Sequence, residues 1–253
     1  MFLRLVQAKI RPEEASRLSD AYREGIVPGL ERTTGCLFAG LAQSSRQPED
    51  VISLTLWTSR EDATAYERSG KFMELLSIAR PFFSDSSEWR LHLTEDLRLE
   101  YGPVPVEPTV FTYDDVPAHR SPPIPEPKSS EYFIRIVSMV VHPGRRSEFV
   151  RVYMSLIVPE LTSVRGCRFM QLAQSMENPD EFISFTVWES ARDAERYEES
   201  GHFARLREFL RPTLSSLYQW KMDQEAERGT QAHTSEDTMV RAYTFLVGKS
   251  FRK

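Results

Sequence analysis

The sequence contains little cysteine and no excess of basic residues. Cys36 and Cys167 are its only cysteines, which are too few for a disulfide framework and lack the Cys-x-x-Cys spacing of a metal site. Lys and Arg number 32 against 37 Asp and Glu, for a net charge of -5, and the two signs are interspersed. A nucleic-acid partner, which needs a clustered basic face, is therefore not expected.

Long apolar runs and cofactor-binding motifs are missing as well. No stretch approaches the roughly 20 apolar residues of a membrane span, and the start, MFLRLVQAKIRPEE, lacks the basic and small-residue segments of a signal peptide. We therefore expect no membrane partner and a cytoplasmic location. The sequence has no glycine-rich phosphate loop, metal-ligand cluster or outstanding Ser-His-Asp spacing, so neither a cofactor nor a metal is expected.

What the sequence does contain is a duplication. A shift of 131 positions aligns residues 1–90 with residues 132–221 without a gap, and 35 of the 90 aligned positions are identical. The segment ISLTLWTSREDATAYERSG at 52–70 returns as ISFTVWESARDAERYEESG at 183–201. A repeat of this length is a whole domain and not one unit of a short-period solenoid.

A proline-rich segment separates the two copies. Its composition favours extended chain with little to bury, so we predict a first domain at 1–102, a linker at 103–130 and a second domain at 131–253. Within the linker, TVFTY has the composition of an edge strand. In the second domain we predict a mobile loop near 224–236, followed by a strand in MVRAYTFLVGKSF.

Each copy shows the same order of predicted elements, described here for the first. FLRLVQAKI is a strand, followed by a helix that Pro28 is expected to break. Two further strands end at Trp57, and Ser59 then caps a second helix that runs through ATAYERSGKFMELL. A strand around Trp89 is expected to close the unit. This order is the ferredoxin-like split βαβ arrangement.

The first strand is apolar on both faces. By the period of two, Val6 and Ala8 lie on one face, whereas Leu3 and Leu5 lie on the other. The helices of the unit pack against one face of the sheet, so the other apolar face requires a second sheet to bury it. We therefore predict an α+β fold in which two ferredoxin-like units pack sheet to sheet as a dimeric α/β barrel within one chain. Further oligomerisation stays open.

The motifs of the repeat resemble a known family. A strand ending in LTLW or FTVW, then Ser and acidic residues, then SGKF or SGHF on a helix, with PGLERTTGCLFAGLAQS upstream, resembles the antibiotic biosynthesis monooxygenase domain. The resemblance covers about residues 1–102 and 131–225. It implies the dimeric α+β barrel superfamily, here tandem duplicated. Members of the family include cofactor-independent oxygenases of aromatic polyketides or quinols and haem-degrading enzymes.

The sequence departs from the family at positions that carry chemistry. Where polyketide-oxidising members have an Asn four residues before the strand Trp, it has Ser53 and Ser184, and alanines stand where those members have a Tyr. Where haem-degrading members have an axial His, it has Leu76 and Arg207. Haem degradation is therefore not expected.

Candidate site residues are those present in both copies and suited to a pocket. The expected catalytic residues are Tyr66, Tyr197, Trp57 and Trp188. The expected substrate-binding residues are Tyr22, Tyr153, Ser53, Ser184, Arg4, Arg135, Gln43 and Gln174. A Trp beside hydroxyl groups can stack on a planar ligand, or it can be a core Trp with its N–H satisfied. A phenol can donate to a substrate carbonyl or deprotonate a phenolic substrate, or it can simply pack helix on sheet.

The polar candidates have structural alternatives too. Arg4 and Arg135 lie in the middle of the first strand of each copy, where a buried guanidinium needs an acid or an anionic ligand. Pairing with Glu67 and Glu198 is the preferred interpretation. The two glutamines are either donors to a pocket or polar residues that line the barrel.

Two functions follow from these features. The first is a cofactor-independent monooxygenase of the family type, acting on a small aromatic or quinol-like substrate that stacks near the Trp and receives a hydrogen bond from the Tyr. The alternative is a non-catalytic module of the same fold that binds a small ligand or has a structural role.

Overall fold

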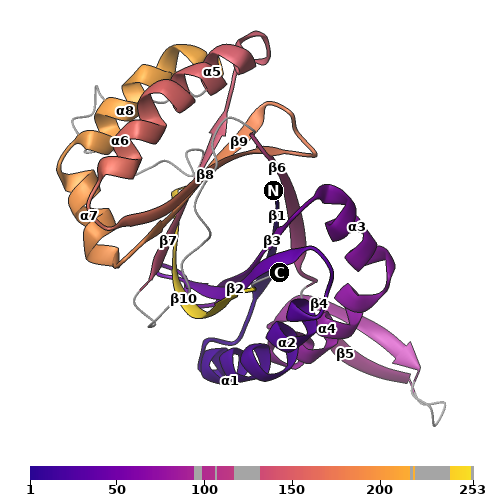
Figure 1. Cartoon of the computed structure of the whole chain (residues 1–253). Helices are drawn as coiled ribbons and strands as arrows, with labels where there is room; N and C mark the ends of the chain where they lie inside the picture. Colours follow the sequence, from indigo (N-terminus) through magenta and orange to yellow (C-terminus); the bar gives the residue numbers. More distant parts are fainter. Residues whose placement is uncertain (94–98, 106, 117–131, 217–218, 220–239, 252–253) are drawn as a thin grey trace.

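Eight antiparallel strands close into one barrel in the computed structural model, which describes residues 1–93, 99–105, 107–116, 132–216, 219 and 240–251 (Figure 1). Their order around the barrel is β1-β3-β2-β10-β7-β9-β8-β6. The strands are β1 (Phe2–Lys9), β2 (Cys36–Ser44), β3 (Asp50–Trp57), β6 (Thr109–Asp115), β7 (Phe133–Val140), β8 (Cys167–Ser175), β9 (Glu181–Trp188) and β10 (Val240–Ser250).

The barrel consists of two ferredoxin-like units. The first has the strand order β6-β1-β3-β2 and the second β10-β7-β9-β8. Pairing of β2 with β10 and of β8 with β6 joins the two units into one closed sheet. The register is also repeated, because Leu3 faces Tyr113 and the equivalent Ile134 faces Tyr243. The predicted α+β class and the intrachain pairing of the two units are confirmed.

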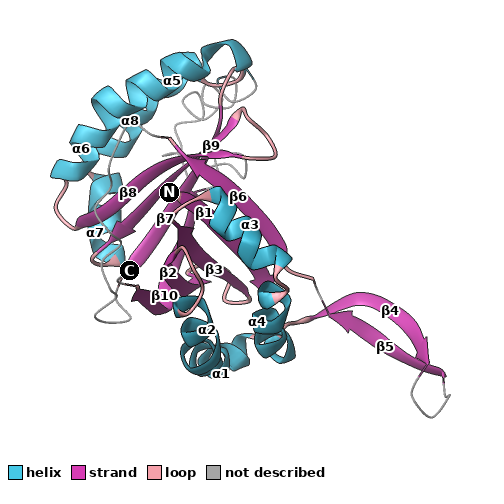
Figure 2. Ribbon diagram, turned by 45° about the vertical axis from the view of Figure 1, so that its right-hand side comes forward, coloured by secondary structure: helices cyan, strands magenta, loops and turns pink. Residues whose placement is uncertain are grey.

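The fourth strand of the first unit differs from the prediction. The segment around Trp89 forms β4 (Asp85–Leu93), which pairs with β5 (Leu99–Pro105) in a separate two-stranded sheet that projects from the barrel (Figure 2). The expectation that it closes the unit was wrong. Strand β6, inside the predicted linker, takes that place and pairs with β1 and β8. It is an interior strand and not an edge, because it is paired on both sides in the closed barrel, and its Tyr113 joins the central core.

In the second unit β10 is the fourth strand, and it falls in the segment predicted as a strand from its composition. The segment around Trp220 and the loop predicted near 224–236 lie outside the described residues.

The helices form two groups on opposite sides of the barrel, one group for each unit (Figure 1). None of those in the described ranges is long and apolar enough to cross a membrane. The helices of the first unit are α1 (Ala15–Ala21), α2 (Val27–Glu31), α3 (Arg60–Arg68) and α4 (Lys71–Ala79). Those of the second unit are α5 (Arg146–Val152), α6 (Val158–Ser163), α7 (Ala191–Glu199) and α8 (His202–Leu210).

Pro28 does not end the first helix, contrary to the prediction. The π-helical turn Tyr22–Ile26 connects α1 to α2, and within it the N–H of Val27 bonds to the carbonyl of Tyr22, five residues back. Proline then lies in the first turn of α2, where a missing N–H costs least. The second unit has the same turn at Tyr153–Ile157. π-helical turns are rare in proteins, but those that occur are often found at functional sites.

The second helix is divided in two. Gly70, with φ of 76°, separates α3 from α4, and Gly201 does the same in the second unit. The predicted cap of α3 is confirmed, because Ser59 Oγ accepts a hydrogen bond from the Asp62 N–H at 3.1 Å.

Apolar side chains pack in three layers. Leu3 and Leu5 point into the barrel, where a central cluster draws on strands of both units. Phe2 and Ala8, on the other face of β1, belong to a cluster between the sheet and the helices of the first unit. A matching cluster fills the same layer of the second unit. The two apolar faces of the strand are therefore covered as its alternation predicts.

Two glycine substitutions separate backbone strain from steric overlap. Gly35 has φ of 78°, and a Cβ there would overlap the Asp62 side chain that bonds Ser59 and Thr58. Gly70 has φ of 76° and open space around it. We expect Gly70→Ala to lower the free energy of unfolding by about 1–2 kcal/mol through the left-handed backbone alone. Gly35→Ala is expected to cost about 1–2 kcal/mol more through the disturbed cap. Urea unfolding of both variants checks this, and equal losses would contradict it.

Candidate functional site

Each unit contains a cavity between the outer face of its sheet and its helices. The centre of a water molecule can move through about 60 Å³ in the first cavity and about 40 Å³ in the second. At roughly 10–15 Å³ for each water position, the first has room for about four to six waters and the second for about three to four. Ten equivalent positions line both cavities with the same residue type. In the first cavity they are Arg4, Val6, Tyr22, Ile26, Leu30, Ser53, Thr55, Tyr66, Phe72 and Leu75. In the second they are Arg135, Val137, Tyr153, Ile157, Leu161, Ser184, Thr186, Tyr197, Phe203 and Leu206.

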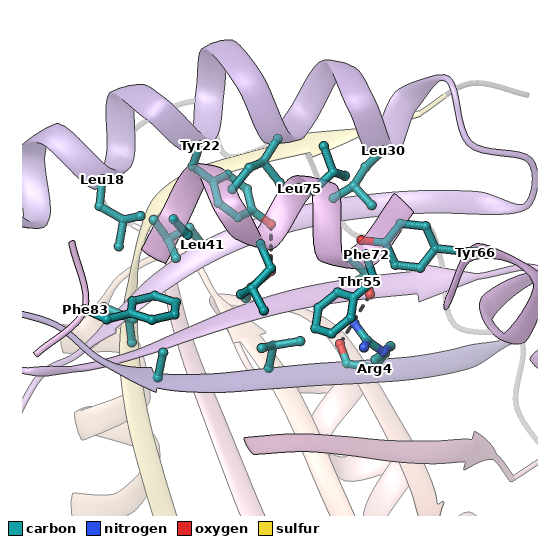
Figure 3. A pocket seen from close by; sticks show the side chains of 17 residues that line it. Arg4, Leu18, Tyr22, Leu30, Leu41, Thr55, Tyr66, Phe72, Leu75 and Phe83 are labelled. Atoms are coloured by element: carbon teal, nitrogen blue, oxygen red, sulfur yellow. Dashed lines mark hydrogen bonds between the residues drawn. The ribbon is translucent and has the colours of Figure 1, made fainter. Parts of the chain in front are cut away.

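Two neighbouring strands form the floor of the first cavity. Arg4, Val6 and Ala8 share one face of β1 because side chains alternate along a strand. Opposite them on β3 lie Thr55, Ser53 and Val51, paired in that order. Figure 3 shows the resulting polarity, with Arg4, Thr55 and Tyr66 at one end and Leu18 and Phe83 at the other.

The π-helical turn carries a tyrosine over the middle of this floor. The Tyr22 hydroxyl donates to the Gly40 carbonyl at 3.2 Å and lies 2.9 Å from Ser53 Oγ. In the second unit the Tyr153 hydroxyl donates to Ser184 Oγ at 2.5 Å. Both pairs were predicted as substrate-binding residues, and the structure brings each pair together at its cavity.

The repeated tryptophans lie behind the cavities. Trp57 is fully buried, and its Nε1 donates to Thr55 Oγ1 at 2.9 Å, a geometry that Trp188 repeats with Thr186. Neither indole lines a cavity. Of the two interpretations of the tryptophans, the structure matches the core residue with its N–H satisfied.

Tyr66 and Tyr197 lie between the tryptophans and the cavities. The Tyr66 ring centre is 4.9 Å from that of Trp57, and the Tyr197 ring centre is 5.2 Å from that of Trp188. Both tyrosines line their cavities. Within the described ranges neither hydroxyl accepts or donates a hydrogen bond. These phenols are therefore available to a ligand.

A buried arginine closes the polar end of each cavity. Arg4 is 3% exposed, and its Nη2 lies 3.4 Å from Oε1 of Glu67, which is about half-exposed. Arg135 is 4% exposed, and its Nη2 lies 2.6 Å from Oε1 of Glu198. The expected ion pairs are therefore present. In the described part of the chain, however, the Nε of each arginine has no hydrogen-bond partner.

An aromatic ring supports each guanidinium. The guanidinium carbon of Arg4 lies 4.0 Å from the ring centre of Phe72, and that of Arg135 lies 4.0 Å from Phe203. This is a close cation–π contact. Sequence reasoning did not select these phenylalanines. The available signal was their identity in both copies, because in these helices only Phe72 and Leu75 recur, as Phe203 and Leu206.

The two predicted glutamines do not join the site. Gln43 Nε2 donates to the Pro48 carbonyl at 2.6 Å, and Gln174 Nε2 donates to the Pro179 carbonyl at 2.7 Å. Neither lines a cavity. Their side chains close the turns between strands, which accounts for their presence in both copies.

Burial sets the protonation of the phenols. Desolvation raises the pKa of Tyr22, Tyr66, Tyr153 and Tyr197 far above that of a free tyrosine. The nearby guanidinium opposes this rise for Tyr66 but does not cancel it. At neutral pH these groups therefore carry their protons, and they act as hydrogen-bond donors rather than as bases.

Comparison with known proteins shows that the sequence matches one protein family. The sequence profile of the antibiotic biosynthesis monooxygenase family matches residues 1–75 and 132–208. These two ranges contain both sets of shared cavity residues. No curated protein matches the chain significantly.

Solved structures match over nearly the whole chain. A "putative monooxygenase" from Lactobacillus acidophilus shares 10% sequence identity at a TM-score of 0.63, covering 98% of this chain and 95% of that chain. One from Fusobacterium nucleatum also shares 10% at a TM-score of 0.57, covering 98% and 94%. An anthrone oxidase-like protein shares 11% at a TM-score of 0.57, covering 100% and 94%. At such low identity these similarities show the fold.

The buried tyrosines predict a loss of stability at alkaline pH. A phenol whose pKa is raised by folding stabilises the protein fully below the unfolded pKa of about 10, and the stability is lost as pH rises beyond it. Each such tyrosine contributes a slope of about 1.4 kcal/mol per pH unit. We therefore expect the free energy of unfolding to fall steeply above pH 10, as measured by urea unfolding over a pH series.

The variant Tyr22→Phe/Tyr153→Phe provides the control, because it removes two of these groups. Its slope above pH 10 should be smaller than that of the wild type by about 2.7 kcal/mol per pH unit. An unchanged slope would show that these phenols do not carry the effect.

Proposed function

The chain belongs to the antibiotic biosynthesis monooxygenase family, and from this membership we propose that it is a cofactor-independent monooxygenase of a small aromatic or quinol-like substrate. The observation that carries the proposal is the cavity in each unit, which combines apolar walls with a buried guanidinium and protonated phenols. Apolar walls accept an aromatic ring, and the polar end accepts its oxygen.

The polar end is suited to an oxygen anion. Arg4 and Tyr66 both line the first cavity, and in the described part of the chain neither the Nε of Arg4 nor the Tyr66 hydroxyl has a hydrogen-bond partner. A cation and a donor in a desolvated site favour the ionised form of a phenol or enol. The lining of the first cavity contains no carboxylate or imidazole. The substrate is therefore activated by stabilising its anion and not by a base in the cavity wall.

The anion is the form that reacts with O2. A phenolate passes one electron to O2, and the resulting radical pair combines to a peroxide at the ring carbon opposite the oxygen. Loss of the hydrogen on that carbon and cleavage of the O–O bond then leave a carbonyl, and the second oxygen departs as water. For 1-naphthol the balance is naphthol plus O2 giving naphthoquinone plus water, so no external reductant is needed. The cavity contributes orientation and desolvation.

A charge-removing variant tests the role of the arginines. Replacing a buried ion-paired group by an apolar one of similar size is often neutral or stabilising, and Glu67 and Glu198 reach solvent when their partners are removed. We expect Arg4→Met/Arg135→Met to keep its melting temperature but to lower kcat/KM for 1-naphthol by about a hundredfold, the effect of losing an oxyanion donor. Arg23→Met removes an exposed guanidinium that pairs with Asp20, and it should change neither quantity.

The reaction class is tested with isotopically labelled O2. A monooxygenase places one labelled atom in the quinone and the other in water, and it produces nothing under nitrogen. Turnover that continues without O2 would overturn the proposal. Binding of naphthol without any labelled product would assign the cavities to the non-catalytic, ligand-binding alternative.

A further inference from the structure

The two cavities share one end and differ at the other. All the polar lining residues of the first cavity recur in the second. One difference is that Arg207 lines the second cavity where Leu76 lines the first. The others lie at the end remote from Arg4, where β1 and β3 carry Ala8 opposite Val51. The matching pair on β7 and β9 is Met139 opposite Phe182. The floor of the second cavity is therefore raised at this end by two larger side chains.

The helices continue this difference. Leu18 and Ala79, which line the remote end of the first cavity, correspond to Phe149 and Leu210 in the second unit. Four of the five remote positions thus carry a larger side chain in the second unit. The fifth is reversed, because Phe83 corresponds to Leu214.

Two of the larger side chains occupy space that is open in the first unit. The ring centres of Phe149 and Phe182 lie 4.9 Å apart, and both rings are buried. Leu18 and Val51 line the first cavity, whereas these two phenylalanines do not line the second. They fill part of the remote end with their own contact, and Met139, Leu210 and Leu214 line what remains of it, which agrees with the smaller volume of the second cavity.

We propose that the two cavities bind ligands of different length, the first taking an aromatic head group with an apolar extension toward Ala8 and Val51, and the second taking the head group alone. The identity of the head group rests on the proposed function. The difference in length rests only on the cross-strand pairs and on the contact between Phe149 and Phe182. Specificity in the first cavity is thus determined by the small residues at its remote end.

The geometry of β1 defines the direction of the extension. Arg4 and Ala8 are four residues apart on one strand face, a separation of roughly 13 Å. A phenol whose oxygen lies at Arg4 directs its para substituent along the strand toward Ala8. An ortho substituent of the same size leaves this line. The inferred ligand of the first cavity is therefore a phenol with an apolar para substituent.

The experiment is calorimetric titration of the whole protein under nitrogen, which separates binding from turnover. Phenol, 4-propylphenol and 2-propylphenol are the probes. We expect phenol to bind at two sites, and 4-propylphenol to bind tightly at one. At about fourfold for each buried methylene, the para substituent should improve affinity in the first cavity by roughly fiftyfold. The ortho isomer, equal in apolar surface, should bind no better than phenol.

Exchanging the cross-strand pairs is the decisive comparison. Ala8→Met/Val51→Phe copies the second floor into the first cavity and should abolish the tight site for 4-propylphenol, while both phenol sites remain. Met139→Ala/Phe182→Val copies the first floor into the second and should create a second tight site. Circular dichroism checks folding, and if one variant fails to fold, the other decides the result.

The outcomes separate this inference from the proposed function. The difference in length would be overturned if 4-propylphenol bound two equal sites in the wild type, or if its tight site survived Ala8→Met/Val51→Phe. Either outcome would leave the proposed phenolic head group of the ligand unaffected. Failure of all three phenols to bind would overturn the head group as well, and with it the substrate class proposed above.

Discussion

The two-faced sheet is the constraint on which this structure depends. Each unit has strands that are apolar on both faces, as Leu3 and Val6 show on β1. Exposure of either face to water would cost a large part of the hydrophobic stabilisation. Helices cover the outer face, and the sheet of the other unit covers the inner one. Fusion of the two units in one chain supplies that second sheet at every concentration.

This arrangement determines where a cavity can lie. The interior of the barrel is filled from both sides by rings such as Phe38, Phe169 and Phe245, so it is a packed core. The layer between sheet and helices is filled mainly by the unit's own side chains, although Phe251 of the second unit joins the cluster of the first. The first helix of the unit contains the π-helical turn. That turn places Tyr22 over Ser53. The same constraint that closes the barrel therefore leaves the outer layer as the place for a binding site.

How much the sequence predicts depends on the range of the interactions involved. The offset of 131 residues, the alternation along β1 and the Ser59 cap are local patterns, and each predicts its element correctly. The pairing of the fourth strand with β1 is not a local interaction. Whether Trp89 or Tyr113 reaches the edge of β1 depends on the path of the intervening chain, which composition does not encode. Pro28 failed as a break because a π turn satisfies the backbone in another way.

The same distinction separates the cavity residues that the sequence predicts from those that it does not. Tyr22, Tyr66 and Arg4 stand out because polar groups that recur in apolar segments need a partner, and the structure places all three at the cavity. Phe72 looks in the sequence like any core ring, and its role follows only from the position of the guanidinium beneath it. Cavity size is less accessible still, because it depends on side chains from two strands and several helices that meet only in the folded chain.

Duplication within one chain also has a consequence for specificity. Two identical subunits must form identical cavities, so a substitution that narrows one narrows both. In this chain the copies change separately. The polar end is the same in both, with Arg4 and Arg135 over equivalent rings at the same distance of 4.0 Å. The remote ends have diverged in side-chain volume, as the pair Val51 and Phe182 shows, and Arg207 lines the second cavity where Leu76 lines the first. Two cavities that share a polar end but differ in volume are an arrangement that a symmetric dimer of single units does not permit.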